Sequence, residues 1–171
     1  MKTILLNTDF EIQKAKTEFV EQFKTEYKYY ETWIAKNKRD FENGKRVIFK
    51  LIADNNIVGY VMINYSSNIT AKINGIFIYQ QFFNRGFASI ALKSILEHLK
   101  EKKYEYAMIQ TRFTNAKVIH MFDKLGFKII GKKVHEIEQK DNVVACYDLK
   151  CNKMQQQLVA EAIKQYQGFS L

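Results

Sequence analysis

The stretch QQFFNRGFAS, residues 80–89, joins an apolar run to a segment with helical periodicity, and its residue types suit the binding of an anion. Gly86 carries no side chain, so the backbone there can approach a ligand closely. The first N–H groups of a helix have no intrahelical acceptor and carry partial positive charge. Arg85 adds a side chain that binds phosphate oxygens. The pattern predicts a cradle for a phosphate or pyrophosphate, although one Gly before a helix is by itself a common structural feature.

The elements that position this loop follow from hydrophobic periodicity. Three strands are predicted, over residues 46–53, 57–65 and 72–79, and the short DNN link between the first two predicts an antiparallel hairpin. From Ala88 the period changes to that of an amphipathic helix. The apolar face of this helix is predicted to comprise Ile90, Ala91, Ile95, Leu96 and Leu99.

Further elements are predicted on both sides of this region. After it come a strand, a short helix stopped by Gly126, and two more strands, over residues 105–113, 115–125, 127–137 and 142–150. Before it, residues 9–43 have a helical pattern with Asp9 as a cap and a second short helix over 30–38. A terminal helix is predicted over 153–168, which is a candidate for a dimer contact. This order of elements indicates an α+β fold with one sheet.

Composition sets the broad class. The chain has 171 residues, of which 47% are hydrophobic, so one globular domain with a sizeable core is expected. Its formal net charge of +9 permits an anionic partner, but the basic residues are scattered and no nucleic-acid-reading motif accompanies them. Neither Cys146 nor Cys151 belongs to a zinc-ligand spacing, and Cys146 is expected to be a small core residue. With no stretch long enough to cross a membrane and no signal-peptide core, the expected location is the cytoplasm.

Two motifs together resemble the GNAT N-acetyltransferase superfamily. In the first loop Gly86, Ala88 and Ser89 match the family's phosphate-loop pattern, whereas Phe83 stands where Arg or Gln is usual. Ile78 and Phe82 match the aliphatic and aromatic positions before it. The second motif is NAKVIHMFDKLGF, an Asn after a strand followed by a helix that ends in Gly-Phe. In this motif the matching residues are Asn115, Gly126 and Phe127.

The resemblance covers residues 45–150 and implies a single domain over 1–171. Residues 1–44 would form variable front helices, and residues 151–171 a tail or helix. The implied fold has a mixed, mostly antiparallel central sheet, splayed between its fourth and fifth strands, with helices on both faces. The implied activity is transfer of an acetyl group from acetyl-coenzyme A, the co-substrate, to an amine of a small molecule or protein. A homodimer is one assembly that the terminal segment allows.

The resemblance also implies which residues bind the co-substrate. The backbone of Phe77, Ile78 and Tyr79 would pair with the pantetheine arm and polarise the thioester carbonyl. The amides of the loop would hold the pyrophosphate, through Phe83, Asn84, Arg85, Gly86, Phe87, Ala88 and Ser89. Asn115 would contact the arm or help to place the acceptor, and Phe122 would lie beside the arm.

Proton transfer is where the chain departs from the family pattern. Many relatives place a Tyr on the helix after the Asn, where this chain has Phe122, and a Glu on the fourth strand, where it has Asn74 and Gly75. The substitutes are Tyr147, which we take as the catalytic candidate beside Asn115, and His120, His135 or Glu136. For each, a core or surface role is the competing interpretation. A non-catalytic coenzyme A-binding module is therefore the alternative function.

The front helices carry the aromatic cluster EYKYYETW, residues 26–33. In folds of this family such a region forms one wall of the acceptor site. Tyr29, Tyr30 and Trp33 would then bind the acceptor, and Glu26 or Glu31 would attract a cationic amine. Aromatic residues at helical spacing also occur as core or dimer contacts.

Overall fold

In the computed structural model, residues 2–5, 35, 39–134 and 141–149 are described, and the chain divides into two compact units. The first unit comprises residues 1–66 and 72–95, and the second comprises residues 67–71 and 96–171. The helices predicted within residues 9–38 and 153–168 lie outside the described residues, apart from residue 35. The expectation of one domain over 1–171 stays a prediction.

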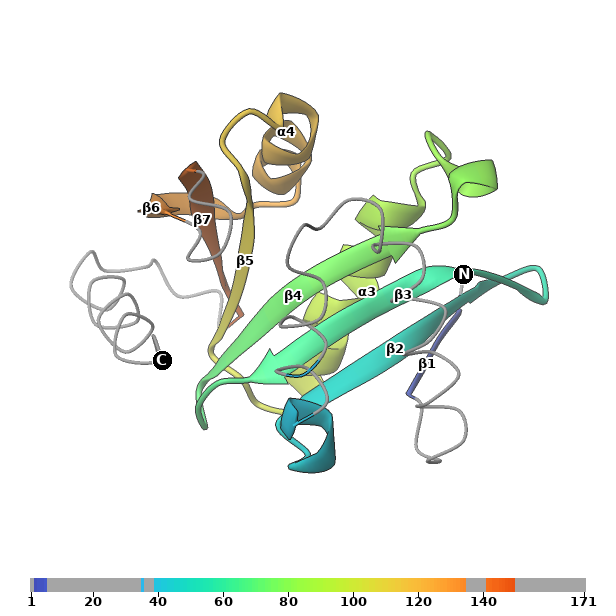
Figure 1. The fold of residues 1–171 in the computed structure, drawn as a ribbon, viewed down its shortest axis with the longest axis horizontal. Coiled ribbons are helices and arrows are strands. Elements are labelled where there is room, and N and C mark those ends of the chain that lie inside the picture. The colour runs from blue at the N-terminus through green and yellow to red at the C-terminus, as the bar shows by residue number, and fades with distance from the viewer. Residues whose placement is uncertain (1, 6–34, 36–38, 135–140, 150–171) are drawn as a thin grey trace. The chain divides into compact units, whose positions relative to one another are not determined.

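The first unit contains four neighbouring strands in the order β1-β2-β3-β4, side by side in Figure 1. Strand β2 is antiparallel to both β1 and β3, so Phe49 is opposite Leu5 on one side and Val61 on the other. The strands are β1 (Lys2–Leu5), β2 (Arg46–Ala53), β3 (Asn56–Tyr65) and β4 (Thr70–Ile78), the last belonging to this unit from Lys72 onward. Strand β1 was not predicted, because four residues are too few to show a period.

The predicted hairpin between β2 and β3 is confirmed. Its turn residues Asp54 and Asn55 have φ angles of 48° and 61°. Two successive residues in this left-handed region form the turn whose twist matches that of the flanking strands, and Asp and Asn tolerate it well. The DNN sequence therefore fixes the turn and the register of the residues next to it, with Ala53 opposite Asn56 and Ile52 opposite Ile57.

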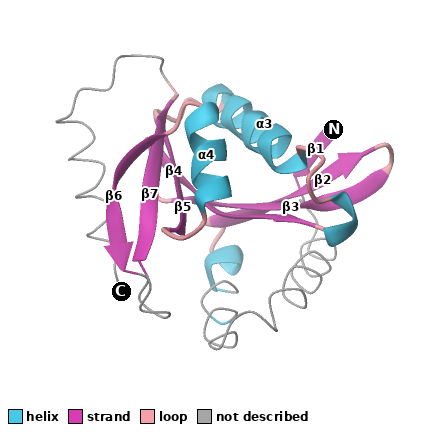
Figure 2. Ribbon diagram, turned by 90° about the horizontal axis from the view of Figure 1, so that it is seen from above, coloured by secondary structure: helices cyan, strands magenta, loops and turns pink. Residues whose placement is uncertain are grey.

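Both faces of the first unit's sheet are covered, as Figure 2 shows for α3 (Phe87–Glu101) above the sheet and the helical residues 39–42 below it. On the lower face, Phe41 packs against a buried cluster of Ile48, Tyr60, Met62 and Phe77. The alternate residues of β2 and β3, such as Leu51 and Val61, are also fully buried. Strands buried on both faces explain the near-continuous apolar runs in the sequence.

The buried face of α3 differs from the predicted one at two positions. Ile90 is 41% exposed, whereas Leu92 is fully buried. Leu92 lies three, four and seven residues before Ile95, Leu96 and Leu99, which is the spacing of one helical face. Ile90 lies off this stripe, so including it in the apolar face was wrong.

The second unit contains β5 (Tyr106–Arg112), β6 (Lys128–Val134) and β7 (Asp141–Asp148), in the order β5-β7-β6. Strand β7 is antiparallel to both of its neighbours. The start of β5 is held to the segment before β4, because the carbonyl of Ile69 accepts hydrogen bonds from the amides of Glu105 and Tyr106 at 2.9 and 3.0 Å. Helix α4 (Ala116–Lys124) lies between β5 and β6 in the chain.

Cys146 belongs to the second unit's core, as predicted. It is 1% exposed and lies in a cluster with Tyr106, Met108 and Val144. Burial, with a smaller effect of the Asp148 carboxylate, raises the pKa of the thiol to about 12. The protonated thiol therefore acts as a small apolar side chain at neutral pH.

The predicted fold class, α+β with a mixed and mostly antiparallel open sheet, is confirmed. In the described part of the chain, no helix is long and apolar enough to cross a membrane.

Candidate functional site

The loop that carries the anion-binding motif begins with a tight turn that was not predicted. Strand β4 ends at Ile78, one residue before the predicted end, and a 3-10 turn, η1, covers Gln80–Phe82. The amide of Phe82 donates to the carbonyl of Tyr79 at 2.8 Å, and that of Phe83 donates to Gln80 at 3.1 Å. This compact turn brings the chain directly to the start of α3 at Phe87.

Backbone conformation opens the loop toward a ligand. Asn84 and Gly86 have φ angles of 58° and 77°, and no atom lies within 4 Å of the position that a Cβ atom of Gly86 would occupy. Alternation of left-handed residues along a turn is typical of anion-binding concavities formed by backbone N–H groups. In α3 the amide of Ile90 donates to the carbonyl of Gly86 at 3.1 Å, so the amides of residues 87–89 precede this first helical bond.

The side chains of the loop support the same role. The rings of Phe82 and Phe87 meet edge to face with their centroids 5.9 Å apart, which ties the 3-10 turn to the first residue of α3. The Arg85 guanidinium lies 5.9 Å from the centroid of the Phe82 ring. The first turn of α3 contains no acidic residue. Phe83, which replaces the usual Arg or Gln, is 53% exposed, so its side chain is not part of the core.

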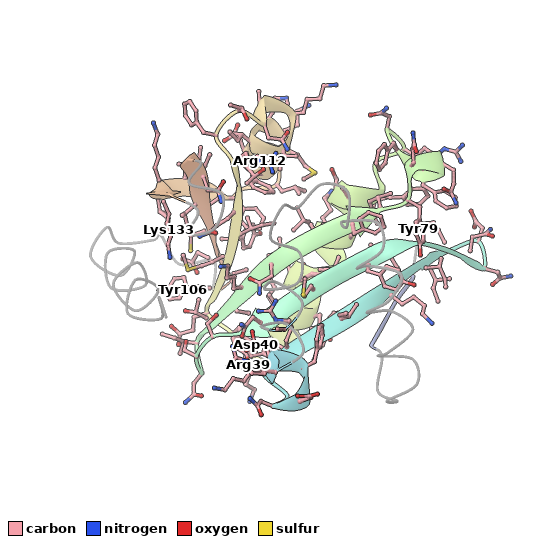
Figure 3. All side chains as sticks on the ribbon, viewed as in Figure 1. Arg39, Asp40, Tyr79, Tyr106, Arg112 and Lys133 are labelled. Atoms are coloured by element: carbon pink, nitrogen blue, oxygen red, sulfur yellow. The ribbon has the colours of Figure 1, made fainter. Side chains whose placement is uncertain are left out.

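The end of β4 is fixed by its neighbour β3. The amide of Tyr79 donates to the carbonyl of Val58 at 3.0 Å. The Tyr79 ring, labelled in Figure 3, meets the rings of Phe77 and Tyr60 edge to face at centroid distances of 5.4 and 6.1 Å. Phe77 and Ile78 are themselves buried. The backbone at 77–79, predicted to pair with the pantetheine arm, is therefore positioned against β3 by this hydrogen bond and these ring contacts.

Sequence reasoning missed a buried polar group on the lower face of the first unit. Arg46 at the start of β2 is 8% exposed, and it donates to the Asp40 carboxylate at 2.6 Å and to the Met62 sulfur at 3.3 Å. Figure 3 labels Asp40 beside the start of β2. In the orientation that satisfies both groups, the Asn74 amide oxygen accepts from the same guanidinium at 3.1 and 3.3 Å.

Electrostatics explain how this group is held inside the protein. Burial lowers the pKa of Arg46, and the Asp40 carboxylate acts in the opposite direction. Asn74 and Gly75 are the residues near the strand position where the resemblance places a Glu, and the Asn74 oxygen is engaged by Arg46. Nothing in the sequence marked Arg46 as buried, because a basic residue at the first position of a strand is usually a solvated end.

In the second unit Asn115 caps α4. Its side-chain oxygen accepts a hydrogen bond from the backbone N–H of Val118 at 3.4 Å, and its backbone N–H donates to the carbonyl of Arg112 at 2.9 Å. Asn is among the preferred residues for this position, so the cap alone accounts for its presence. The predicted contact of Asn115 with the co-substrate or acceptor stays a prediction.

Phe122 and Tyr147 pack around the second motif's Gly-Phe pair. Phe122 is buried, and its ring centroid lies 5.6 Å from that of Phe127. The ring centroid of Tyr147 lies 5.3 Å from that of Phe127. A Cβ atom on Gly126 would lie 3.3 Å from the Tyr147 ring, and the φ angle of 90° at Gly126 confirms the predicted helix stop. These contacts give Tyr147 a packing role, and its catalytic role stays a prediction.

The other candidates for proton transfer and for acceptor binding have no contacts described in the structure that bear on these roles. His120 is exposed on α4. Outside the described residues lie the predicted acceptor-site residues and the other proton-transfer candidates, namely Glu26, Tyr29, Tyr30, Glu31, Trp33, His135 and Glu136. The loop and β4 residues belong to the first unit, and Asn115, Phe122 and Tyr147 to the second.

Comparison with known proteins places these features in a class. Residues 10–127 match the model of the acetyltransferase (GNAT) family. The match spans more than half of the chain, and both motifs described above fall within it. The chain therefore belongs to the GNAT acetyltransferase family. A comparison with curated protein sequences finds no match.

Solved structures of this fold resemble the chain at low sequence identity. A GNAT family acetyltransferase from Elizabethkingia anophelis with acetyl-CoA bound is 20% identical, with a TM-score of 0.56 and coverage of 66% of this chain and 82% of that one. A variant of the spermidine N-acetyltransferase SpeG from Vibrio cholerae is 12% identical, with a TM-score of 0.70 and coverage of 88% and 96%. An aminoglycoside 6'-acetyltransferase type Ii is 10% identical, with a TM-score of 0.69 and coverage of 90% and 100%.

Proposed function

We propose that this protein is an N-acetyltransferase that transfers the acetyl group of acetyl-coenzyme A to a primary amine of a small molecule or protein. The observation that carries the proposal is the open, left-handed backbone at Gly86 directly before α3, in a chain of the GNAT family. One structural neighbour contains acetyl-CoA, which supports use of an acyl-coenzyme A by this fold.

Binding of the co-substrate divides between two features of the first unit. The amides of residues 83–89 and the Arg85 side chain hold the pyrophosphate, because both the backbone N–H groups and the guanidinium favour an anion. The backbone of residues 77–79 pairs with the pantetheine arm as an added strand would. The arm thereby places the thioester carbonyl near an N–H group that stabilises developing negative charge.

The reaction is direct attack by a neutral amine on the thioester carbonyl. A C–N bond forms, the C–S bond breaks, the amine nitrogen loses a proton and the departing sulfur receives one. Asn115 is the candidate for placing the acceptor, and Tyr147 is the candidate for donating a proton to the sulfur. A water chain is the competing route, since positioning alone contributes much of the rate when the amine is already partly neutral.

The acceptor class is proposed from chemistry and from the neighbours. Spermidine and aminoglycosides, named for two neighbours, are amines, so small polyamines and amino sugars are the first acceptors to test. One neighbour is a dodecameric spermidine N-acetyltransferase, which supports testing for a homo-oligomer such as the dimer expected from the sequence. The cytoplasm remains the proposed location.

A second function is favoured by two observations. Phe122 stands where the family usually has a proton-donating Tyr, and Asn74, which with Gly75 lies near the usual Glu position, has its oxygen engaged by Arg46. A chain lacking both groups can bind coenzyme A as a sensing or regulatory ligand without turning it over. This alternative shares the binding site and differs only in the chemistry.

The test combines calorimetric titration of acetyl-coenzyme A with thiol release over a panel of amines. Gly86→Asp adds a negative charge to the cradle, and like-charge juxtaposition costs several kcal/mol, so we expect affinity to fall at least ~100-fold while the fold is kept. Gly44→Asp is the matched control. Gly44 also has a positive φ, of 66°, and open space around its Cβ position, so it carries the same backbone strain away from the loop.

Wild-type binding with thiol release supports the enzyme, and binding without release for any amine supports the regulatory module. Equal affinity of wild type and Gly86→Asp would contradict the placement of the phosphates at this loop.

A further inference from the structure

The backbone of β4 lies directly against a glycine of β3. A Cβ atom built on Gly59 would lie 1.9 Å from the carbonyl oxygen of Phe77 and 2.9 Å from the Cα atom of Ile78. Real Cβ atoms essentially never come closer than 3.0 Å to a heavy atom outside their own residue and its chain neighbours. The atoms in the way belong to backbone, which cannot rotate aside as a flexible side chain can. Only glycine therefore fits at position 59.

The close approach accompanies an irregularity in β3. Leu51 of β2 is opposite Gly59, but the next residue, Ile52, is opposite Ile57, so Val58 is an extra residue in β3. An inserted residue of this kind is a β-bulge, which bends a strand and re-aims its groups, and bulges occur often beside active sites. The carbonyl of Val58 then accepts from the amide of Tyr79 at 3.0 Å.

This geometry fixes the direction of one N–H group. No cis peptide bond occurs among the described residues, so the N–H of Ile78 points opposite to the carbonyl of Phe77 across their shared peptide plane. Because that carbonyl points at Gly59, the Ile78 N–H points away from β3. This is the side of β4 opposite to β3 in the strand order.

We propose that Gly59 is a positioning residue for the acyl-coenzyme A, acting through the peptide group between Phe77 and Ile78. The inference rests on the function proposed above. By lacking a side chain, Gly59 lets this peptide sit close to β3, which sets where the Ile78 N–H meets the pantetheine arm and its thioester. Gly59 thereby controls binding of the arm, whereas the Gly86 loop controls binding of the nucleotide half.

The expected effect follows from the distances. A methyl group on Gly59 must move the carbonyl of Phe77 from 1.9 Å to at least 3.0 Å, which is a displacement of about 1 Å. A misplacement of this size in a site that positions reactants costs roughly 100-fold in rate. The displacement lies at the end of β4, before the phosphate loop begins.

The experiment compares two ligands on two variants by calorimetric titration. Acetyl-coenzyme A uses both the loop and the β4 backbone, whereas 3′-phosphoadenosine 5′-diphosphate, its nucleotide half, uses the loop alone. We expect Gly59→Ala to bind acetyl-coenzyme A at least tenfold more weakly than wild type and to bind the nucleotide half within twofold of wild type. The control is Gly131→Ala, a glycine in β6 with no atom within 4 Å of its Cβ position, which should leave both affinities unchanged.

A second measurement covers the case in which Gly59→Ala does not fold. Hydrogen exchange on the wild-type protein should show the Ile78 amide protected by acetyl-coenzyme A but not by the nucleotide half. Equal weakening of both ligands in Gly59→Ala, or bound acetyl-coenzyme A without protection at Ile78, would overturn the inference. Failure of wild type to bind either ligand would instead refute the proposed function on which the inference rests.

Discussion

Asn115 shows at the scale of one residue why a motif position and a structural position are hard to separate. Its side chain caps α4 through the amide of Val118, which is sufficient reason for an Asn at that place. The family resemblance gives the same residue a role toward the co-substrate or acceptor. The two roles make different demands, since the cap needs an oxygen acceptor whereas an amide also offers N–H donors.

Asn115→Ala and Asn115→Asp separate these roles. We expect Ala to lower the free energy of unfolding by about 1 kcal/mol through loss of the cap, and Asp, which caps equally well, to keep it. If the amide acts on the reaction, thiol release falls at least tenfold in both variants. Urea unfolding and steady-state kinetics provide the two measurements. Full activity in Asn115→Asp would show that Asn115 is a helix cap only.

At the scale of elements, the pair between Asp40 and Arg46 joins the helical residues 39–42 to the first residue of β2. The Arg46 side chain is 7% exposed and the Asp40 side chain 23%. Removing one partner of a largely buried pair leaves the other charge without its counter-ion, which costs far more than the pair itself contributes. The ordered position of these helical residues against the sheet therefore depends on this pair and on the packing of Phe41.

Asp40→Asn is expected to lower the free energy of unfolding by about 2 kcal/mol. This value is at the lower end of the range for removing one partner of a buried charge pair, because Asp40 is partly exposed. Glu97→Gln is the matched control, because it breaks the exposed pair with Lys100 on α3, which spans 3.2 Å. An exposed pair contributes about 0–1 kcal/mol, so this control should change little. Equal losses for both variants in urea titrations would show that Arg46 does not need the Asp40 carboxylate.

At the scale of the whole molecule, the charge of +9 and the family membership lead to one expectation about ligands. A polyanionic co-substrate should be attracted by the protein's field, and this attraction is screened by salt. Nucleic acid would be attracted by the same field without using the loop.

We therefore expect acetyl-coenzyme A to raise the melting temperature in a concentration-dependent way. At 100 times its Kd, the free energy of unfolding should increase by about 2.7 kcal/mol. Its affinity should weaken as KCl increases. A mixed-sequence DNA duplex at equal phosphate concentration serves as the control and should not stabilise the protein. Stabilisation by DNA that is lost in salt, with no effect of acetyl-coenzyme A, would point to nucleic-acid binding instead.

The local features of the fold were predictable because they are encoded within a few neighbouring residues. The DNN turn, the strand over residues 46–53 and the stop at Gly126 all follow from turn chemistry and periodicity, and the structure agrees with each. Strand β1 was missed because four residues show no period, and their strand conformation is apparent only from their pairing with β2. Ile90 was assigned to the wrong face because the apolar stripe of α3 is set by what packs on it.

The sequence by itself determined the family, the order of the strands and α-helices from β2 to β7, and the loop with Gly86, since motif spacing and hydrophobic period are properties of neighbours along the chain. Only the tertiary structure decided that Arg46 is buried beside Asp40 and Asn74, that Tyr147 packs on Phe127, and that Gly59 lies against the backbone of Phe77. These are contacts between residues distant in sequence. Their distances depend on strand register and bulges, which no single segment encodes.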